Sequence, residues 1–261
     1  MSDTITIGVL SLQGAFVEHI ALLHQAIQHH HHHHTFTFLH VRTPADLSRC
    51  HALILPGGES TAISLIAERT GLLEPLRHFV KVRRRPVWGT CAGLILLAEQ
   101  ADRTKATGQA LIGGLDVRVR RNHFGRQVES FAADLALAFL ETGDGGGGLE
   151  KRATAAAFPA VFIRAPVVQR VLLPTASNGS SPGDPDTVLA PARQSTAAAV
   201  QILARLPVRG PADADADGAI VAVRQGNVFG TAFHPELTGD CRVHAWWLGE
   251  VVKAVEAERA S

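Results

Sequence analysis

The stretch ITIGVLSLQGAFVEHIALLHQAI, residues 5–27, decides the plan of the fold. Residues 5–10 form a short apolar run that is typical of a buried strand, and residues 15–27 place apolar side chains at helical spacing. The pair Gln13-Gly14 lies between them. The stretch therefore predicts a strand, a turn and a helix, in that order.

The same unit recurs through the first half of the chain. Residues 35–41 and 52–55 are strand-like, residues 61–68 and 72–85 are helix-like, and residues 86–89 begin another strand. Strands that alternate with helices indicate an α/β fold, doubly wound, with a mostly parallel central sheet and flanking helices.

The second half changes to shorter alternating strands. They are expected at residues 117–121, 128–134, 160–163, 220–223 and 228–233. Such strands predict an antiparallel extension of the sheet. The turn Gln225-Gly226-Asn227 suits a tight hairpin between the last two strands, and residues 242–256 have the spacing of an amphipathic helix.

Length and composition fit one globular domain over residues 1–261, with 46% hydrophobic and 19% charged residues. Residues 142–157, which include a run of glycines, and residues 174–218, rich in Pro, Ala, Ser and Asp, are expected to be mobile surface insertions. A formal charge of +1 without an extended basic surface argues against nucleic acid as a partner. No apolar run approaches the roughly 20 residues that span a membrane.

Cysteines and histidines bear on location and on metals. The sequence shows no secretory leader and its three cysteines cannot all pair, so we expect reduced thiols in the cytoplasm. Six consecutive histidines occupy residues 29–34. Because consecutive ligands do not enclose an ion with defined geometry, this run is expected to be an exposed loop, and no metal site is predicted.

The strongest chemical signal is Gly89-Thr90-Cys91-Ala92-Gly93, between a short apolar strand and the helical stretch at residues 94–98. A nucleophile on a sharp strand-to-helix turn needs small neighbours on both sides, because its backbone is strained. The start of a helix favours a thiolate, and the Ala92 N–H can hold a developing oxyanion. The alternative is a small buried core cysteine. Cys50 and Cys241 lack this setting and are expected to be inert.

A histidine and a glutamate follow the last predicted strand, in Phe233-His234-Pro235-Glu236. A thiol nucleophile needs a base, and the base needs an acceptor on its other ring nitrogen. A histidine at a strand end, taken alone, is more often only packed or hydrated. Because triad partners are neighbours in space rather than in sequence, Cys91, His234 and Glu236 are the predicted catalytic residues.

A glycine-rich turn, Leu55-Pro56-Gly57-Gly58-Glu59-Ser60-Thr61, follows a strand and opens a helix. Its glycines let the backbone approach a ligand and point N–H groups at it. The lysine and the spacing of a phosphate-binding loop are missing. A substrate-cradling turn that contributes to an oxyanion hole is expected, with an ordinary tight turn as the alternative.

Together these motifs resemble the triad glutamine amidotransferases (class I), and within them the glutaminase subunit of pyridoxal 5′-phosphate synthase. The resemblance covers nearly the whole chain apart from the insertions and the histidine run. It rests on six ordered blocks, namely LQGAF with Glu18-His19 (12–19), PGGEST (56–61), GTCAG (89–93), RNHFGRQ (121–127), FIRAP (162–166) and HPELT (234–238).

This resemblance implies hydrolysis of L-glutamine to L-glutamate and ammonia through a thioester on Cys91. His234 would move protons with Glu236 orienting it, and the N–H groups of Gly58 and Ala92 would hold the oxyanion. The implied glutamine contacts are Gly58, Glu59, Ser60, Arg121, Ile163 and Arg164. The chain itself would bind no cofactor and would pass ammonia to a synthase subunit, within a hetero-oligomer that makes pyridoxal 5′-phosphate.

Two arginines and Gln13 have expected roles on physical grounds, and two other functions are possible for the chain. Arg121 or Arg164 suits the carboxylate of a zwitterionic substrate, with a surface ion pair as the alternative. Gln13, in the first strand-to-helix turn, is expected near the oxyanion region or a partner interface. The rivals are a non-catalytic regulatory or scaffold subunit, which the intact triad argues against, and an elbow-cysteine hydrolase of the protease or deglycase type. The latter does not explain His-Pro-Glu after the last strand.

Overall fold

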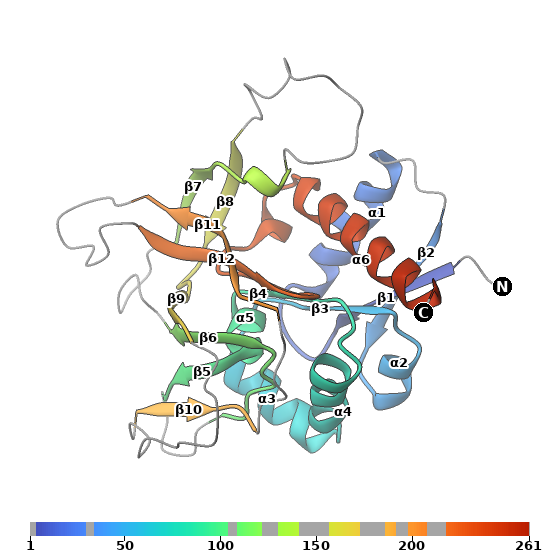
Figure 1. Cartoon of the computed structure of the whole chain (residues 1–261), viewed down its shortest axis with the longest axis horizontal. Helices are drawn as coiled ribbons and strands as arrows, with labels where there is room; N and C mark the ends of the chain where they lie inside the picture. Colours follow the sequence, from blue (N-terminus) through green and yellow to red (C-terminus); the bar gives the residue numbers. More distant parts are fainter. Residues whose placement is uncertain are drawn as a thin grey trace.

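A large central sheet with helices on both faces dominates the computed structural model, as Figure 1 shows. The structure describes residues 4–29, 34–103, 109–121, 130–140, 157–172, 186–191, 198–207 and 218–260. The parallel half of the sheet consists of β1 (Thr4–Leu10), β2 (Thr35–Val41), β3 (Ala52–Leu55), β4 (Val87–Thr90) and β13 (Val228–Thr231). Neighbours within the order β13-β4-β3-β1-β2 are all parallel.

The other half of the sheet contains antiparallel pairs. Its strands are β5 (Ala98–Asp102), β6 (Leu115–Arg120), β9 (Val167–Val171), β10 (Thr187–Leu189), β11 (Gln201–Leu206) and β12 (Ala219–Gln225). The full order is β10-β5-β6-β9-β12-β13-β4-β3-β1-β2, with β11 paired to β12. A separate antiparallel pair joins β7 (Phe131–Leu135) to β8 (Phe158–Phe162). The predicted α/β fold with an antiparallel extension is thus confirmed.

Helices cover both faces of the parallel half (Figure 1). On one face α1 (Phe16–His29) packs against α6 (Arg242–Ala260). On the other lie α3 (Ser60–Arg69), α4 (Leu73–Arg77) and α5 (Ala92–Leu97). The short α2 (Pro44–Ser48) begins with a capping box between Thr43 and Asp46. The described residues also form two 3₁₀ turns, η2 (Ala138–Leu140) and η4 (Pro235–Leu237), and one π-helix described below.

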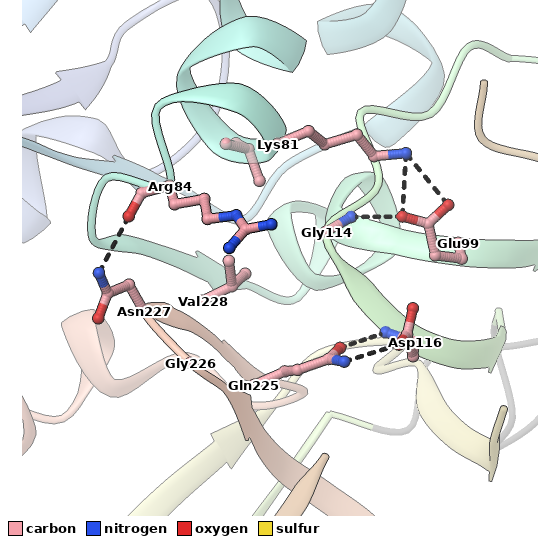
Figure 2. Close-up of a pocket in the computed structure, with 10 residues that line it drawn as sticks. Lys81, Arg84, Glu99, Gly114, Asp116, Gln225, Gly226, Asn227 and Val228 are labelled. Carbon is pink, nitrogen blue, oxygen red and sulfur yellow. Dashed lines mark hydrogen bonds and ion pairs between the residues drawn. The ribbon is translucent and has the colours of Figure 1, made fainter. Parts of the chain in front are cut away.

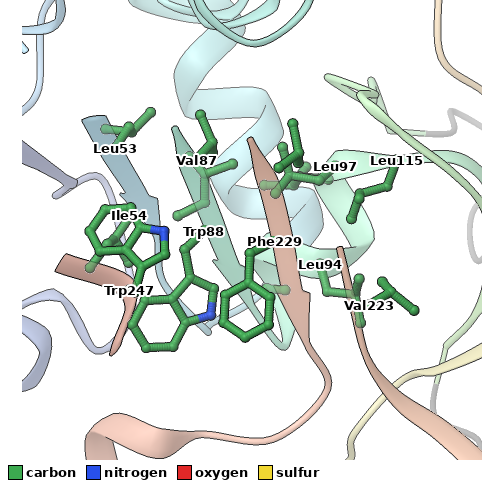
Figure 3. Close-up of a cluster of buried hydrophobic side chains, with 14 of the residues drawn as sticks. Leu53, Ile54, Val87, Trp88, Leu94, Leu97, Leu115, Val223, Phe229 and Trp247 are labelled. Atoms are coloured by element: carbon green, nitrogen blue, oxygen red, sulfur yellow. The ribbon is translucent and has the colours of Figure 1, made fainter. Parts of the chain in front are cut away.

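The core of the parallel half is built around the aromatic face of β4 and β13. Trp88 and Phe229 are register partners with ring centroids 5.5 Å apart, and Trp247 of α6 lies 5.7 Å from Trp88. Figure 3 shows the three rings in one cluster, with Leu94 and Leu97 of α5 near the same strands. All five side chains are buried, so the hydrophobic effect holds the helices against the sheet.

Glycines on the opposite face let α5 approach the strands closely. A Cβ on Gly89 would lie 2.5 Å from the carbonyl carbon of Gly93 and 2.7 Å from a methyl group of Leu97. A Cβ on Gly93 would lie 2.0 Å from the carbonyl oxygen of Leu55. These distances are far shorter than nonbonded contacts in packed interiors. The small residues expected on both sides of Cys91 are therefore required by packing.

The hairpin predicted between the last two strands is confirmed. Gln225 and Val228 are register partners across a turn formed by Gly226 and Asn227. Gly226 has a φ of 57°, a left-handed conformation that glycine adopts without a steric penalty. The three residues Gln225-Gly226-Asn227 were therefore sufficient to predict the hairpin.

Three expectations were wrong. Residues 72–85 do not form one helix, because α4 ends at Arg77 and the chain continues as the π-helix η1 (His78–Val82). The helical stretch expected at residues 94–98 ends at Leu97, since Ala98 has a ψ of 144° and the chain enters β5 there. Residues 174–218 are not simply a surface insertion, because β10 and β11 join the sheet through β5 and β12.

A shared physical reason explains the strands that were missed. β5, β10 and β11 gain their stability from backbone pairing within the assembled sheet, and composition does not report such pairing. Three further regions of interest lie outside the described residues: the histidines at 30–33, the motif residues 122–127, and residues 142–156.

Replacing Gly93 by alanine is expected to destabilise the protein by about 1–3 kcal/mol or more, because the new methyl group would overlap the Leu55 backbone. Gly249→Ala is the matched control. Gly249 lies inside α6 with no atom within 4 Å of an added Cβ, so alanine should stabilise by roughly 0.5–1 kcal/mol. Urea unfolding measures both changes. Wild-type stability in Gly93→Ala would contradict the close packing of α5.

Candidate active site

Parallel pairing brings four segments of the chain to one edge of the sheet. β1, β3, β4 and β13 lie side by side and run in the same direction, so their carboxyl ends finish together. The segments that follow these strands are residues 11–15, 56–59, 91–93 and 232–238. They contain the predicted triad, the glycine-rich turn and Gln13.

Cys91 occupies a strained turn between β4 and α5. Its φ of 47° and ψ of −98° lie outside the regions that L-residues favour. Its backbone N–H donates to the Thr231 carbonyl oxygen at 2.8 Å, which ties the turn to β13. The residue is 7% exposed, and its Sγ lies 4.0 Å from the carbonyl oxygen of Ile163. The thiol is therefore held in a fixed position with narrow access.

His234 links the thiol to a buried carboxylate. Its ring interacts with the Cys91 side chain, and its Nδ1 lies 2.7 Å from Glu236 Oε1. Burial lowers the pKa of His234, but interactions with the Cys91 and Glu236 side chains outweigh burial and raise this pKa to about 10. The cationic form of His234 is consequently favoured at neutral pH.

The glycine-rich turn packs directly against this histidine. A Cβ on Gly57 would lie 2.2 Å from Cε1 of His234, so a side chain there would displace the ring. Gln13 supports the turn from the segment after β1: its Oε1 accepts a hydrogen bond from the Glu59 N–H at 2.8 Å. A Cβ on Gly58 would lie 2.3 Å from the same oxygen. Gln13 therefore contacts the backbone that was expected to form part of an oxyanion hole.

Two of the expected substrate-binding residues form structural hydrogen bonds in the same turn. Glu59 is the N-cap of α3, and its carboxylate accepts from the N–H groups of Thr61 at 3.0 Å and Ala62 at 2.7 Å. Ser60 is buried, and its hydroxyl donates to Gln109 Oε1 at 3.0 Å. Gln109 had drawn no attention in the sequence. The local role of both side chains is to fix the start of α3.

The remaining expected contacts come from β6 and β8. Burial lowers the pKa of Arg121, and the carboxylates of Asp102 and Glu59 partly offset that effect. Ile163 turns its carbonyl oxygen toward Cys91. Arg164 is exposed, has a φ of 43° and forms no ion pair with any residue in the described part of the chain. A strained backbone at an exposed cation, one residue after the carbonyl group that faces the thiol, is typical of a ligand-binding position.

A cluster of buried histidines lies behind the triad, and sequence reasoning assigned it no role. His19 of α1 and His244 of α6 have no exposed surface, and His19 Nδ1 lies 3.0 Å from His244 Nε2. His19 Nε2 lies 3.2 Å from Thr90 Oγ1 and 3.4 Å from Glu236 Oε2. In the sequence, His19 belongs to the motif at residues 12–19, and His244 lies in a predicted amphipathic helix. Neither pattern predicts a contact between the two rings.

The other two cysteines take no part in this arrangement. All three cysteines of the chain are free. Burial raises the pKa of Cys50 to about 12, and burial also raises the pKa of Cys241. Neither thiol is thus a ready nucleophile. Across the residues that the structure describes, helices of the length and apolar character needed to cross a membrane are absent.

A separate cavity of about 210 Å³ lies at the opposite end of β13, beside its first residue, Val228. Figure 2 shows Lys81 paired with Glu99, and Gln225 bonded to Asp116. Lys81 Nζ lies 3.0 Å from Glu99 Oε1, and Gln225 Nε2 donates to Asp116 Oδ2 at 2.6 Å. No cysteine, serine or histidine lines this cavity, so the chemistry belongs to the Cys91 edge of the sheet.

The Cys91 edge has the parts needed for acyl transfer through a thioester. A thiol, an imidazole and a carboxylate lie in line, and backbone N–H groups from the glycine-rich turn and the start of α5 are nearby. The described residues contain no group of three or more potential metal ligands.

The sequence profile of the SNO glutamine amidotransferase family matches residues 9–206 and 201–253. Pyridoxal 5′-phosphate synthase subunit SNO1 from Saccharomyces cerevisiae is 40% identical over 248 residues, which cover 94% of this chain and 92% of the relative. The probable subunit PDX2 from Arabidopsis thaliana is 40% identical over 257 residues, covering 98% and 89%. Subunit PdxT from Herpetosiphon aurantiacus is 39% identical over 244 residues, covering 94% and 99%.

A solved structure agrees with the sequence matches. A crystal structure described as a glutamine amidotransferase superposes with a TM-score of 0.62 and 34% sequence identity. The match covers 94% of this chain and 98% of that one.

The buried histidines are expected to make stability fall in acid. Burial lowers the pKa of His244 from 6.5 to about 3, so folding favours the neutral ring. Its contribution is complete above about pH 6.5 and is lost toward pH 3, at roughly 1.4 kcal/mol per pH unit. His234, whose pKa is raised to about 10, contributes stability that is constant below about pH 6.5 and is lost only as the pH rises from there toward 10, outside this window.

Urea unfolding between pH 7 and pH 4 tests this expectation. His244→Gln should flatten the dependence of the unfolding free energy on pH by about one proton relative to wild type. His24→Gln, which changes an exposed histidine of α1, is the control and should leave the slope unchanged. Equal slopes in wild type and His244→Gln would contradict the neutral buried ring.

Proposed function

The chain belongs to the SNO glutamine amidotransferase family, and on that basis we propose that it hydrolyses L-glutamine to L-glutamate and ammonia. We further infer that a pyridoxal 5′-phosphate synthase subunit receives the ammonia, because relatives with about 40% identity bear the name of a subunit of that synthase. The observation that carries the proposal is the line formed by Cys91, His234 and Glu236.

In the first half of the proposed reaction, the Cys91 thiolate attacks the carboxamide carbon of glutamine. A carbon–sulfur bond forms, and the carbonyl electrons move to the oxygen, where the N–H groups of Gly58 and Ala92 stabilise the negative charge. The His234 imidazolium then gives its proton to the leaving nitrogen. The carbon–nitrogen bond breaks, ammonia departs, and a γ-glutamyl thioester remains on Cys91.

In the second half, a water molecule replaces the ammonia. Neutral His234 takes a proton from this water as it adds to the thioester, and Glu236 stabilises the imidazolium that forms. The carbon–sulfur bond then breaks, and glutamate leaves. Sulfur returns to the thiolate state beside a protonated ring, which is the state favoured by the raised pKa of His234.

Recognition of glutamine is proposed to involve the residues around this edge. Gly58, Glu59, Ser60 and the Ile163 backbone would surround the side-chain amide and the ammonium group. An arginine, either Arg121 or Arg164, would pair with the α-carboxylate. Arg164 is the better placed of the two for a free substrate, because it is exposed and close in sequence to the carbonyl group that faces the thiol.

Delivery of ammonia to a partner fits the chemistry of the product. Free ammonia is protonated in bulk water and then no longer acts as a nucleophile, so release into a docked synthase preserves its reactivity. Neither the proposed hydrolysis nor the transfer needs a cofactor or a metal ion in this chain. The cytoplasm is the proposed location, and the three free cysteines support it.

Cys91→Ala is expected to lower glutamine turnover by at least about a thousandfold, because it removes the nucleophile. The assay measures ammonia and glutamate, with and without a pyridoxal 5′-phosphate synthase subunit. Cys241→Ala removes a half-buried thiol elsewhere in the chain and should retain wild-type turnover. Glutamine turnover at the wild-type rate in Cys91→Ala would contradict the assignment of Cys91 as the nucleophile.

Labelling separates this function from its rivals. A glutamine analogue with an electrophilic carbon should modify Cys91 alone, as mass spectrometry can show. A scaffold subunit would show no selective adduct, and a hydrolase of the protease or deglycase type would turn over other substrates in preference to glutamine. Either outcome would replace the proposed function.

Arg164→Gln is expected to raise KM for glutamine by about tenfold or more with a smaller change in kcat, because it removes the cation that pairs with the substrate carboxylate. Arg170→Gln is the matched control, since Arg170 is also exposed but lies on β9, away from the thiol. Steady-state kinetics at saturating synthase partner measure both constants. Equal KM values in the two variants would shift the carboxylate contact to Arg121.

A further inference from the structure

Behind the triad, polar contacts continue from Glu236 into the protein interior. Glu236 Oε1 is 2.7 Å from His234 Nδ1, while Oε2 faces His19 Nε2 at 3.4 Å. This second contact is electrostatic rather than a hydrogen bond, because Glu236 Oε2 has no hydrogen-bond partner within the described residues. His19 is therefore the group that stands opposite the free oxygen of the carboxylate.

The unpaired Nδ1 atom of His244 determines which ring nitrogens of His244 and His19 carry protons. His244 Nδ1 is buried and has no hydrogen-bond partner within the described residues. A buried N–H without an acceptor costs more than a bare ring nitrogen, so the proton of His244 belongs on Nε2. His244 Nε2–H then donates to His19 Nδ1 at 3.0 Å. A neutral His19 consequently carries its own proton on Nε2.

This proton placement points a donor at the triad carboxylate. His19 Nε2–H lies between Thr90 Oγ1 at 3.2 Å and Glu236 Oε2 at 3.4 Å. Rotation about the last side-chain bond of a glutamate is soft, so one hydrogen bond through Oε1 does not fix the plane of the carboxylate. A positive N–H dipole facing the second oxygen restricts that rotation and stabilises the buried negative charge.

We propose that His19 is a positioning residue of the glutaminase reaction, held by His244 so that its Nε2–H faces Glu236 and keeps this carboxylate in line with His234. Thr90, which directly precedes the nucleophile, shares the same N–H. The kinetic consequence rests on the proposed function, whereas the proton placement does not.

The surroundings of the two rings keep them neutral. Burial lowers the pKa of His19 well below 6.5, and electrostatic interactions with His244 and His234 lower it further. Burial likewise lowers the pKa of His244, which the carboxylate of Asp240 only partly offsets. Glu236 and Cys91 are the other titratable groups facing this region. A neutral His19 is the form that can act as both acceptor and donor.

Proton placement is testable on the wild-type protein by NMR. Long-range ¹H–¹⁵N correlation of ¹⁵N-histidine-labelled protein distinguishes the two neutral tautomers, with His19→Gln and His244→Gln providing the assignments. Both rings are expected as Nε2–H tautomers between pH 6 and pH 8. An Nδ1–H tautomer or a cationic ring at His19 would overturn the proposal without reference to any activity.

Kinetics test the consequence for catalysis. His19→Leu removes the donor, and kcat for glutamine is expected to fall by about 10- to 100-fold with KM nearly unchanged, since the buried ring touches no substrate. His19→Gln keeps an N–H donor and should recover about tenfold of that loss. His24→Gln, on the same helix, should match wild type. A wild-type kcat in His19→Leu, or an equal fall of kcat in His19→Leu and His19→Gln, would contradict the positioning role of His19.

The two proposals fail in different ways. Absence of glutaminase activity in wild-type protein with its synthase partner would remove the proposed function and leave the tautomer result standing. Active wild type, inactive Cys91→Ala and fully active His19→Leu would keep the function and remove the role of His19. Thermal unfolding of His19→Leu and His19→Gln shows whether each variant is folded. If one variant is unfolded, the NMR measurement of the His19 tautomer in the wild-type protein still tests the proposal.

Discussion

The parallel pairing of β13 with β4 is the interaction on which the rest of the structure depends. It sets Thr231 beside Thr90 and lets the Cys91 N–H donate to the Thr231 carbonyl oxygen. Three residues after Thr231 the chain reaches His234, already beside the thiol. A slip of β13 by one residue would turn Phe229 away from Trp88 and from α6 and would move His234 along the edge. The same register thus fixes the core and the site together, and aromatic burial enforces both.

Much of this arrangement could be predicted from the sequence, because its signals are local. The elbow is readable from Gly89 and Gly93, and the packing of α5 against Leu55 explains why both are glycines. The hairpin is readable from its turn residues. β5, β10 and β11 and the break after Arg77 were not predicted, because they depend on pairing within the assembled sheet and on the π-helix that follows. The contact of His19 with His244 joins residues 225 positions apart, and neither sits in a pattern that distinguishes it from a core histidine.

The site concentrates unfavourable features that the surrounding frame must offset. Cys91 has a strained backbone, and His234 with Glu236 places ionic groups in the interior. Rigid neighbours keep these features in place: Gly57 lies against the imidazole, Gln13 secures the Glu59 N–H, and Glu59 caps α3. The buried carboxylate of Glu236 is tolerated because His234 pairs with one of its oxygens and His19 faces the other.

The position of β13 has a consequence for how the protein is made. This strand is the last one in the sequence, yet it lies in the middle of the sheet between β12 and β4. A nascent chain that has emerged only as far as β12 leaves the edge of β4 open and the sulfur without its imidazole. The Cys91 and His234 side chains therefore come together only when the sheet is completed, late in synthesis, and a truncated product exposes an unpaired strand edge that invites aggregation.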